Sequence, residues 1–143
     1  MIFAVNTETR PLRADAERNR KRLLDAAAAV FAEHGLEAST AEIARRAGVG
    51  QGTVFRRFPT KDDLVAAIVV DRLHEITDTA RALLADPPAE GAVLAFMSEL
   101  AQIHVRDRGL VEAVNGTRAL ADPAVHDAHG GLMDVLELSL IHI

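Results

Sequence analysis

Apolar residues recur at intervals of three and four positions over most of the chain, which predicts an all-α protein. The first such pattern covers about residues 14–34. Its apolar stripe consists of Leu23, Leu24, Ala27, Val30 and Phe31, and Gly35 follows as a helix-ending residue. Further helical patterns cover about residues 61–84, 89–106, 110–120 and the stretch that begins at Asp122. Gly130 and Gly131 weaken the last of these, so a break is expected there.

Residues 39–61 combine two short helical patterns around a tight turn. Ser39 with Glu42 three residues later forms the sequence of a capping box, which predicts a helix start. Gly48 suits the left-handed conformation that ends such a helix. A second helix is expected to begin near Gly50 or Gln51 and to stop at Pro59.

The two short helices have distinct faces. Ile43, Ala44 and Ala47 share one side of the first helix, while Val54, Phe55 and Phe58 are expected to face inward from the second. The remaining side chains of the second helix point outward and are polar or basic: Gln51, Thr53, Arg56 and Arg57. A short helix of this kind has the dimensions and chemistry to enter the major groove of DNA. The pattern alone also fits an ordinary helical hairpin with a solvated basic face.

The motif resembles that of the TetR family of bacterial transcriptional regulators over about residues 18–64. The residues that carry this resemblance are Ala44-x-x-Ala47-Gly48-Val49-x-x-Gly52-Thr53-Val54-Phe55-x-x-Phe58-x-x-Lys61-x-x-Leu64, with Leu23-Leu24-Asp25-Ala26-Ala27-x-x-x-Phe31-Ala32-x-x-Gly35 upstream. The resemblance implies a three-helix DNA-binding domain joined by a long helix to an α-helical effector-binding and dimerisation domain. It also implies a homodimeric protein, usually a repressor, that binds a palindromic operator in double-stranded DNA and responds to a small-molecule effector.

The expected DNA contacts follow from the outward face and the resemblance together. Gln51 and Thr53 are expected at base edges, and Arg56 at a guanine or a phosphate. Phosphate contacts are expected from Ser39, Thr40, Arg57 and Lys61, with Arg45 and Arg46 as weaker candidates. Gly52 and Phe55 complete the set of expected DNA-binding residues, although Phe55 stands where the family most often has tyrosine and so lacks the hydroxyl. The effector pocket is expected to include Phe96, Met97 and His104.

Charge is distributed unevenly along the chain. The formal net charge is -5, but residues 1–61 carry +4 and residues 62–143 carry -9. A basic head on an acidic body is typical of a DNA-contacting module. Arg10 and Arg13 belong to a basic arm at residues 1–14, for which backbone or minor-groove contact and a solubilising role are both open. The sequence indicates neither a signal peptide nor a membrane span, so a cytoplasmic protein that does not act at the membrane is expected.

The expected domains are the arm at 1–14, the helix-turn-helix domain at 15–61 and a partial effector-binding and dimerisation domain at 62–137. Residues 138–143, Leu-Ser-Leu-Ile-His-Ile, match the translation of a transposon-end adaptor used for sequencing libraries. We therefore expect these six residues to be an assembly artefact and the regulator to be truncated. A naturally short variant is the alternative.

Enzyme chemistry finds little support in the sequence. There is no cysteine, no glycine-rich phosphate loop and no serine set in a strand–helix elbow. His126 and His129 lie three residues apart but lack a matching pair of further ligands, so we expect solvated surface residues, no metal and no cofactor. A helical protein-interaction module and a small α-helical enzyme remain the competing hypotheses.

Overall fold

The computed structural model describes residues 9–85 and 90–141, and within them the chain is helical with no strand. The α-helices are α1 (Thr9–His34), α2 (Thr40–Ala47), α3 (Gln51–Arg57), α4 (Lys61–Leu83), α5 (Ala92–Arg106), α6 (Arg108–Asn115) and α7 (Pro123–Ile141). Two 3-10 turns, η1 (Gly35–Glu37) and η2 (Ala119–Ala121), join them. The all-α fold is therefore confirmed, and none of the described helices has the length and hydropathy to cross a membrane.

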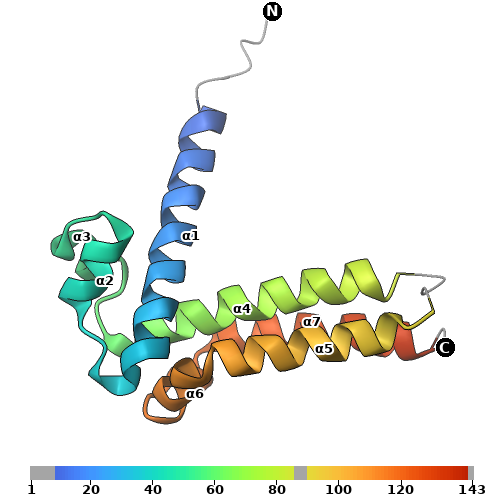
Figure 1. The fold of residues 1–143 in the computed structure, drawn as a ribbon. Coiled ribbons are helices and arrows are strands. Elements are labelled where there is room, and N and C mark those ends of the chain that lie inside the picture. The colour runs from blue at the N-terminus through green and yellow to red at the C-terminus, as the bar shows by residue number, and fades with distance from the viewer. Residues whose placement is uncertain (1–8, 86–89, 142–143) are drawn as a thin grey trace, which may run out of the picture.

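The helices form an L-shaped molecule (Figure 1). α4, α5 and α7 run side by side as the body, and α1 rises steeply from one end of this layer. α2 and α3 lie together on one side of α1, while α6 lies near the foot of α1. The helix-turn-helix, α2 and α3, thus lies near the corner where α1 meets the body.

One hydrophobic core fills this corner. It joins the head, which consists of α1, α2 and α3, to the body. Leu23, Val30 and Phe31 from α1 are at most 2% exposed, and they pack in the same cluster as Val54 of α3. The cluster continues through α4 to Ala113 of α6 and Val125 of α7. Burial of large apolar side chains is worth about 1.5–3 kcal/mol each, so this shared core fixes the position of the head on the body.

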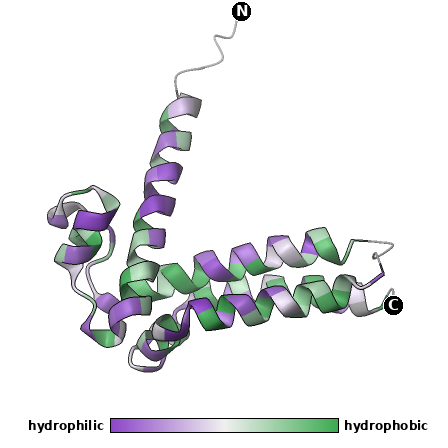
Figure 2. Cartoon of the chain, in the orientation of Figure 1, coloured by the Kyte–Doolittle hydropathy of each residue, from purple (hydrophilic) through white to green (hydrophobic). Residues whose placement is uncertain are grey.

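A second, smaller core lies along the far part of the body. Its buried members are Ala80, Phe96 and Leu132 from α4, α5 and α7. Figure 2 shows that α5 is mostly hydrophobic, and Leu94 and Met97 of that helix are 72% and 56% exposed. The body therefore buries one side of α5 and leaves apolar side chains on another.

The expected start of α1 is wrong. The helix begins at Thr9, so residues 9–14 belong to it and not to a loose arm, while residues 1–8 lie outside the described part of the chain. Pro11 is compatible with this because proline lacks only an N–H that the first turn of a helix leaves unpaired in any case.

The boundaries near α6 and α7 also differ from expectation. α6 ends at Asn115, well before Leu120, and η2 covers part of the difference. α7 begins as expected, with an oxygen of the Asp122 carboxylate accepting from the N–H of Ala124 at 2.8 Å. It runs through Gly130 and Gly131 without a break, because packing on α4 outweighs a glycine penalty of about 1 kcal/mol per residue.

Candidate nucleic-acid interface

Local hydrogen bonds hold both ends of α2. Ser39 is the N-cap, and its hydroxyl oxygen accepts from the backbone N–H of Glu42 at 3.4 Å. The Glu42 carboxylate turns to Arg45 and Arg46 and not back to Ser39, so the expected capping box is formed in one direction. At the other end Gly48 adopts φ 69°, a conformation that glycine reaches without steric cost. The expected turn between α2 and α3 is therefore confirmed.

The inward face of α3 is narrower than expected. Val54 is 1% exposed and Phe58 packs against the same core, four residues further on. Phe55, which was expected to face inward, is 47% exposed. Neighbouring residues on a helix point about 100° apart, and in a helix of seven residues only one narrow stripe reaches the core. Phe55 therefore adds an apolar, aromatic surface to the outward face.

The outward face of α3 carries the expected DNA-reading side chains. Gln51, Gly52, Arg56 and Arg57 are exposed, and Thr53 is half-buried. Arg56 folds along its own helix, where Nε donates to the carbonyl of Gly52 and Nη2 to the hydroxyl of Thr53, both at 3.3 Å. These bonds are long and exposed, so a base or phosphate can replace them at little cost.

Three of the residues expected to contact phosphates lie at the N-termini of two helices, α2 and α4. Ser39 and Thr40 lie at the N-terminus of α2, where the helix dipole favours an anion. Lys61 opens α4, and its ammonium donates to the carbonyl of Leu36 at 2.6 Å. Thr60 and Asp63 form a complete capping box beside it. In the free protein the Lys61 side chain is thus tied to η1, although it remains exposed.

Arg46 links α2 to α1 and is thereby less available to DNA. Its guanidinium donates to Glu33 at 2.5 and 2.7 Å and to Glu42 at 2.7 Å. Hydrogen bonds from Arg45 and Arg46 lower the pKa of Glu42 to about 2, and the bond from Arg46 also lowers the pKa of Glu33. Both arginines were weaker phosphate candidates, and these contacts give Arg46 a bracing position between the helices.

Acidification should loosen this link. Both carboxyl groups have a pKa below their ordinary value of 4.5, so their contribution is present above that pH and is lost as the pH falls towards 2. We expect the urea midpoint of the wild-type protein to fall between about pH 5 and about pH 3 by more than that of an Arg46→Met variant. Arg57→Met, which removes an exposed arginine from α3, serves as the charge-matched control. Equal acid sensitivity of all three proteins would contradict the prediction.

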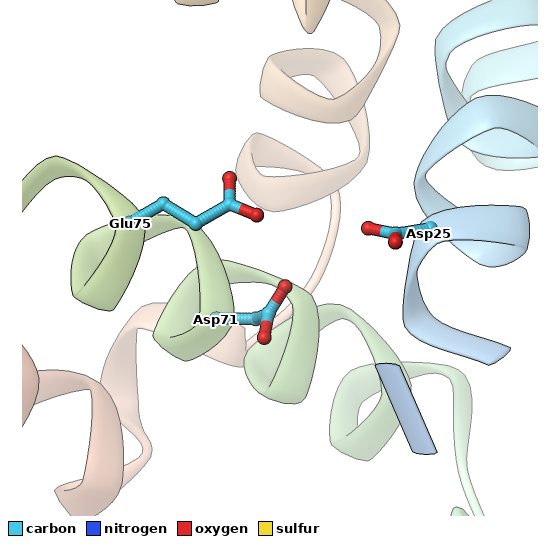
Figure 3. A group of neighbouring side chains, drawn as sticks. All are labelled: Asp25, Asp71 and Glu75. Atoms are coloured by element: carbon cyan, nitrogen blue, oxygen red, sulfur yellow. The ribbon is translucent and has the colours of Figure 1, made fainter. Parts of the chain in front are cut away.

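A cluster of charged residues joins α1 to α4. The ammonium of Lys21 donates to Asp25 at 3.1 Å, to Asp71 at 2.7 Å and also to Glu75. Figure 3 shows the three carboxylates, Asp25 on α1 facing Asp71 and Glu75 on α4. Their oxygens lie within 4.8 Å of one another, a spacing that suits a metal ion, but here Lys21 supplies the positive charge. Partial burial alone would lower the pKa of Lys21, but its hydrogen bonds to the carboxylates outweigh this and raise it.

A groove of about 550 Å³ runs between α4, α5 and α6. Met97 and His104, two of the residues predicted to bind an effector, line it. Phe96 does not line it, because that side chain is 5% exposed and packs into the second core. The groove also holds two charged residues that the sequence did not single out, Arg72 and Asp107. Neither stands in a motif, and only the fold brings α4 to the junction of α5 and α6.

Comparison of the sequence with known families and proteins shows what this chain is similar to. The family described as "Bacterial regulatory proteins, tetR family" matches residues 23–68, which include α2, α3 and the start of α4. The chain is 32% identical to the HTH-type transcriptional repressor KstR of Rhodococcus jostii over 82% of its own length and 57% of that protein. It is 39% identical to the HTH-type transcriptional regulator SrpR of Pseudomonas putida over 44% of its own length and 30% of that protein. The chain thus spans less than a third of the second relative and a little over half of the first.

Solved structures extend the likeness over most of the chain. A TetR transcription regulatory protein from Mycobacterium vanbaalenii is 43% identical, with a TM-score of 0.77 over 92% of this chain and 79% of that one. The TetR transcriptional regulator SCO0520 from Streptomyces coelicolor is 30% identical, with a TM-score of 0.66 over 86% and 70% of the two chains. The matched helix-turn-helix and these structural likenesses lead to one conclusion: the chain belongs to the TetR family of bacterial regulatory proteins.

Proposed function

We propose that this protein is a DNA-binding transcriptional regulator, a repressor that holds a palindromic operator and releases it when a small molecule binds its body. The observation that carries the proposal is the exposed, polar and basic face of α3 in a helix-turn-helix whose first helix, α2, is capped at both ends. The relatives and structural neighbours named above are transcriptional regulators, which favours this function over an enzyme or a protein-interaction module.

The chemistry of the α3 face supports base reading. Gln51 and Thr53 lie in the first turn of the helix, where a recognition helix approaches base edges. Glutamine pairs with adenine through two hydrogen bonds, and the threonine methyl packs on thymine. Arg56 and Arg57 in the last turn supply charge for guanine or phosphate. Gly52, between Gln51 and Thr53, has no side chain that would keep DNA away from the helix surface. Phe55 adds apolar contact.

A homodimer would present two such helices to the two halves of an operator. Half-sites in helix-turn-helix complexes lie about 34–36 Å apart, one turn of DNA. Residues 62–137 would supply the effector-binding and dimerisation surfaces. A regulator of this kind acts on DNA, so we expect it in the cytoplasm.

α4 offers a physical route from the groove to the head. It starts beside α3, lines the groove with Val69, Leu73 and Ile76, and is tied to α1 through Lys21. A ligand that binds better to one tilt of α4 than to another shifts the equilibrium between the two. The same shift changes the spacing of the two recognition helices, and this coupling of two sites through one element is allosteric.

A gel-shift assay tests the DNA-binding part of the proposal. The DNA upstream of the protein's own gene serves as the probe, in a range of salt concentrations. We expect a discrete complex whose affinity falls steeply with salt, and a footprint with two symmetrical halves. Absence of any complex at low salt would favour a protein-interaction module instead.

Gln51 and Lys61 should separate base reading from phosphate contact. We expect Gln51→Ala to relax the preference at one base pair per half-site, by about 1–3 kcal/mol. We expect Lys61→Ala to weaken all sequences alike and to reduce the salt slope by about one unit. The measurement is a binding titration on the footprinted operator and its single-base variants at several salt concentrations.

Thermal melting of both variants provides the control, because Lys61 also bonds to the carbonyl of Leu36 and its loss can affect folding. Arg81→Ala is the matched control, since that side chain is exposed and pairs with Asp78 on α4, away from the helix-turn-helix, and we expect it to leave selectivity and salt slope unchanged. If Gln51→Ala and Lys61→Ala change selectivity and salt slope in the same way, the division of roles is wrong.

A further inference from the structure

The groove between α4, α5 and α6 has one polar end in an otherwise apolar wall. The apolar lining includes Leu73, Ile76, Leu100 and Ile103, whereas Arg72, His104 and Asp107 supply its polar groups. Its volume of about 550 Å³ lies within the range of small-molecule sites. A ligand that fills it must therefore be mainly apolar, with any polar group placed near Arg72.

Arg72 brings a guanidinium group to this end of the groove. Its Nη1 donates to Glu75 at 2.8 Å. Its Nε is buried and lies 3.2 Å from an oxygen of Asp107, so a ligand in the groove cannot reach this atom. The side chain is 16% exposed, and a guanidinium has five N–H donors, so the N–H groups that these carboxylates leave without a partner can bond to an acceptor in the groove.

The surrounding charges decide which kind of acceptor fits. The cluster around Arg72 has four carboxylates, from Asp25, Asp71, Glu75 and Asp107, and three cations, from Lys21, Arg72 and Arg106. The guanidinium charge is thus already compensated, and a ligand carboxylate would add a fifth anion to a site with a net negative charge. Like charges at such distances repel strongly in a partly buried site.

A ligand cation is disfavoured for a different reason. Asp107 is the carboxylate that lines the groove, and it is 6% exposed. Arg72 lies within ion-pair distance of one of its oxygens, and Arg106 donates to both at 3.3 and 3.4 Å. An ammonium group would have to displace an arginine to reach it. The groups that remain available to a ligand here are guanidinium N–H donors whose charge is already compensated, so they call for an acceptor without charge.

We propose that the groove takes an uncharged, mainly apolar effector with one hydrogen-bond acceptor, such as a carbonyl oxygen, and that Arg72 selects it through its guanidinium group. This proposal rests on the effector-responsive function proposed above, because it names the chemical class that the same groove binds. The bond to Arg72 also reaches Glu75, and through it Lys21 of α1, so the ligand acts on the cluster that ties the head to α4.

Direct binding of three probes of equal chain length tests the class. The probes are methyl nonyl ketone, undecanoate and undecylammonium, titrated into the wild-type protein near neutral pH and followed by calorimetry. We expect the ketone to bind about tenfold or more tightly than either charged probe, because undecanoate adds an anion to a site with a net negative charge and undecylammonium has to displace an arginine. Equal or tighter binding of undecanoate or undecylammonium, or no binding of the ketone to the folded protein, would overturn the proposal.

Two variants on α4 test the role of Arg72. We expect Arg72→Met to weaken the ketone about tenfold. Arg81→Met should leave ketone binding unchanged, because Arg81 is exposed, pairs with Asp78 and lies outside the groove. Circular dichroism checks that both variants fold, and the comparison of probes on the wild-type protein decides the matter if Arg72→Met does not. Unchanged ketone affinity in a folded Arg72→Met variant would show that Arg72 is not the selecting residue.

The binding assay and the gel-shift assay fail independently. A ketone that binds without changing the operator complex supports the ligand class and contradicts ligand-responsive regulation. An operator complex without ketone binding leaves the DNA-binding function standing and overturns the ligand class.

Discussion

Replacing Gly109 with alanine is expected to lower the free energy of unfolding by about 3 kcal/mol, at the upper end of ordinary overpacking. Gly109 lies in the first turn of α6, against the end of α1. A Cβ at this position would overlap the carbonyl oxygens of Phe31 and Ala32. Backbone atoms cannot rotate away as a side chain can, so α6 must move off α1 and open the core that Ala113 shares with Phe31.

Urea unfolding followed by circular dichroism measures this loss. Gly131→Ala provides the matched control, because it is the same substitution inside α7 with no atom within 4 Å of the new Cβ. There the change should be neutral or stabilising by up to about 1 kcal/mol, the difference in helix propensity. If the two variants unfold at the same urea concentration, α6 is not packed on α1 as closely as described here.

Replacing Lys21 with methionine should be the second strongly destabilising change. It removes the cation that faces Asp71 and Glu75 across the α1–α4 contact and leaves their carboxylates in mutual repulsion. Loss of one partner from a buried ion pair costs about 3–5 kcal/mol. The Lys21 side chain is 40% exposed, so solvent screening reduces our expectation to about 2 kcal/mol. The shared core still joins the head to the body, but the contact between α1 and α4 should be less rigid, and under the proposed function an effector should change operator affinity less.

The pH dependence distinguishes repulsion from lost packing. Burial alone would raise the pKa of Glu75, but its hydrogen bonds with Lys21 and Arg72 lower it below 4.5. The wild-type protein therefore loses this contribution as the pH falls below that value, whereas protonation relieves the repulsion in Lys21→Met. We expect the gap in urea midpoint between the two proteins to narrow from about pH 7 to about pH 4. Adding Glu75→Gln to Lys21→Met should restore part of the stability, and a further additive loss would show that repulsion is not the cause.

The sequence by itself determined the local frame of the DNA-binding site. Ser39 at the start of α2, Gly48 at its end and Pro59 after α3 act through contacts only a few residues long. The spacing of Val54 and Phe58 likewise fixes which side of α3 is buried, and hence which polar residues face outward. Periodicity also predicted the separate helices of the body.

At some positions tertiary packing overrode the pattern of apolar and polar residues, and the expectation drawn from that pattern was wrong. Phe55 is exposed because the core admits only one narrow stripe of so short a helix. α7 continues through Gly130 because its packing on α4 outweighs local propensity. Such outcomes depend on what lies opposite a residue, which a pattern along one helix does not contain.

The groove that we propose as the effector site, and its link to the head, were decided by tertiary structure alone. Arg72 and Asp107 are 35 positions apart in the sequence, and Lys21 is 50 positions from Asp71. Read singly, each looks like an ordinary charged residue on a helix surface. Their chemistry arises only when α1, α4 and the α5–α6 junction meet, because charge pairing and desolvation depend on distances in space and not on spacing along the chain.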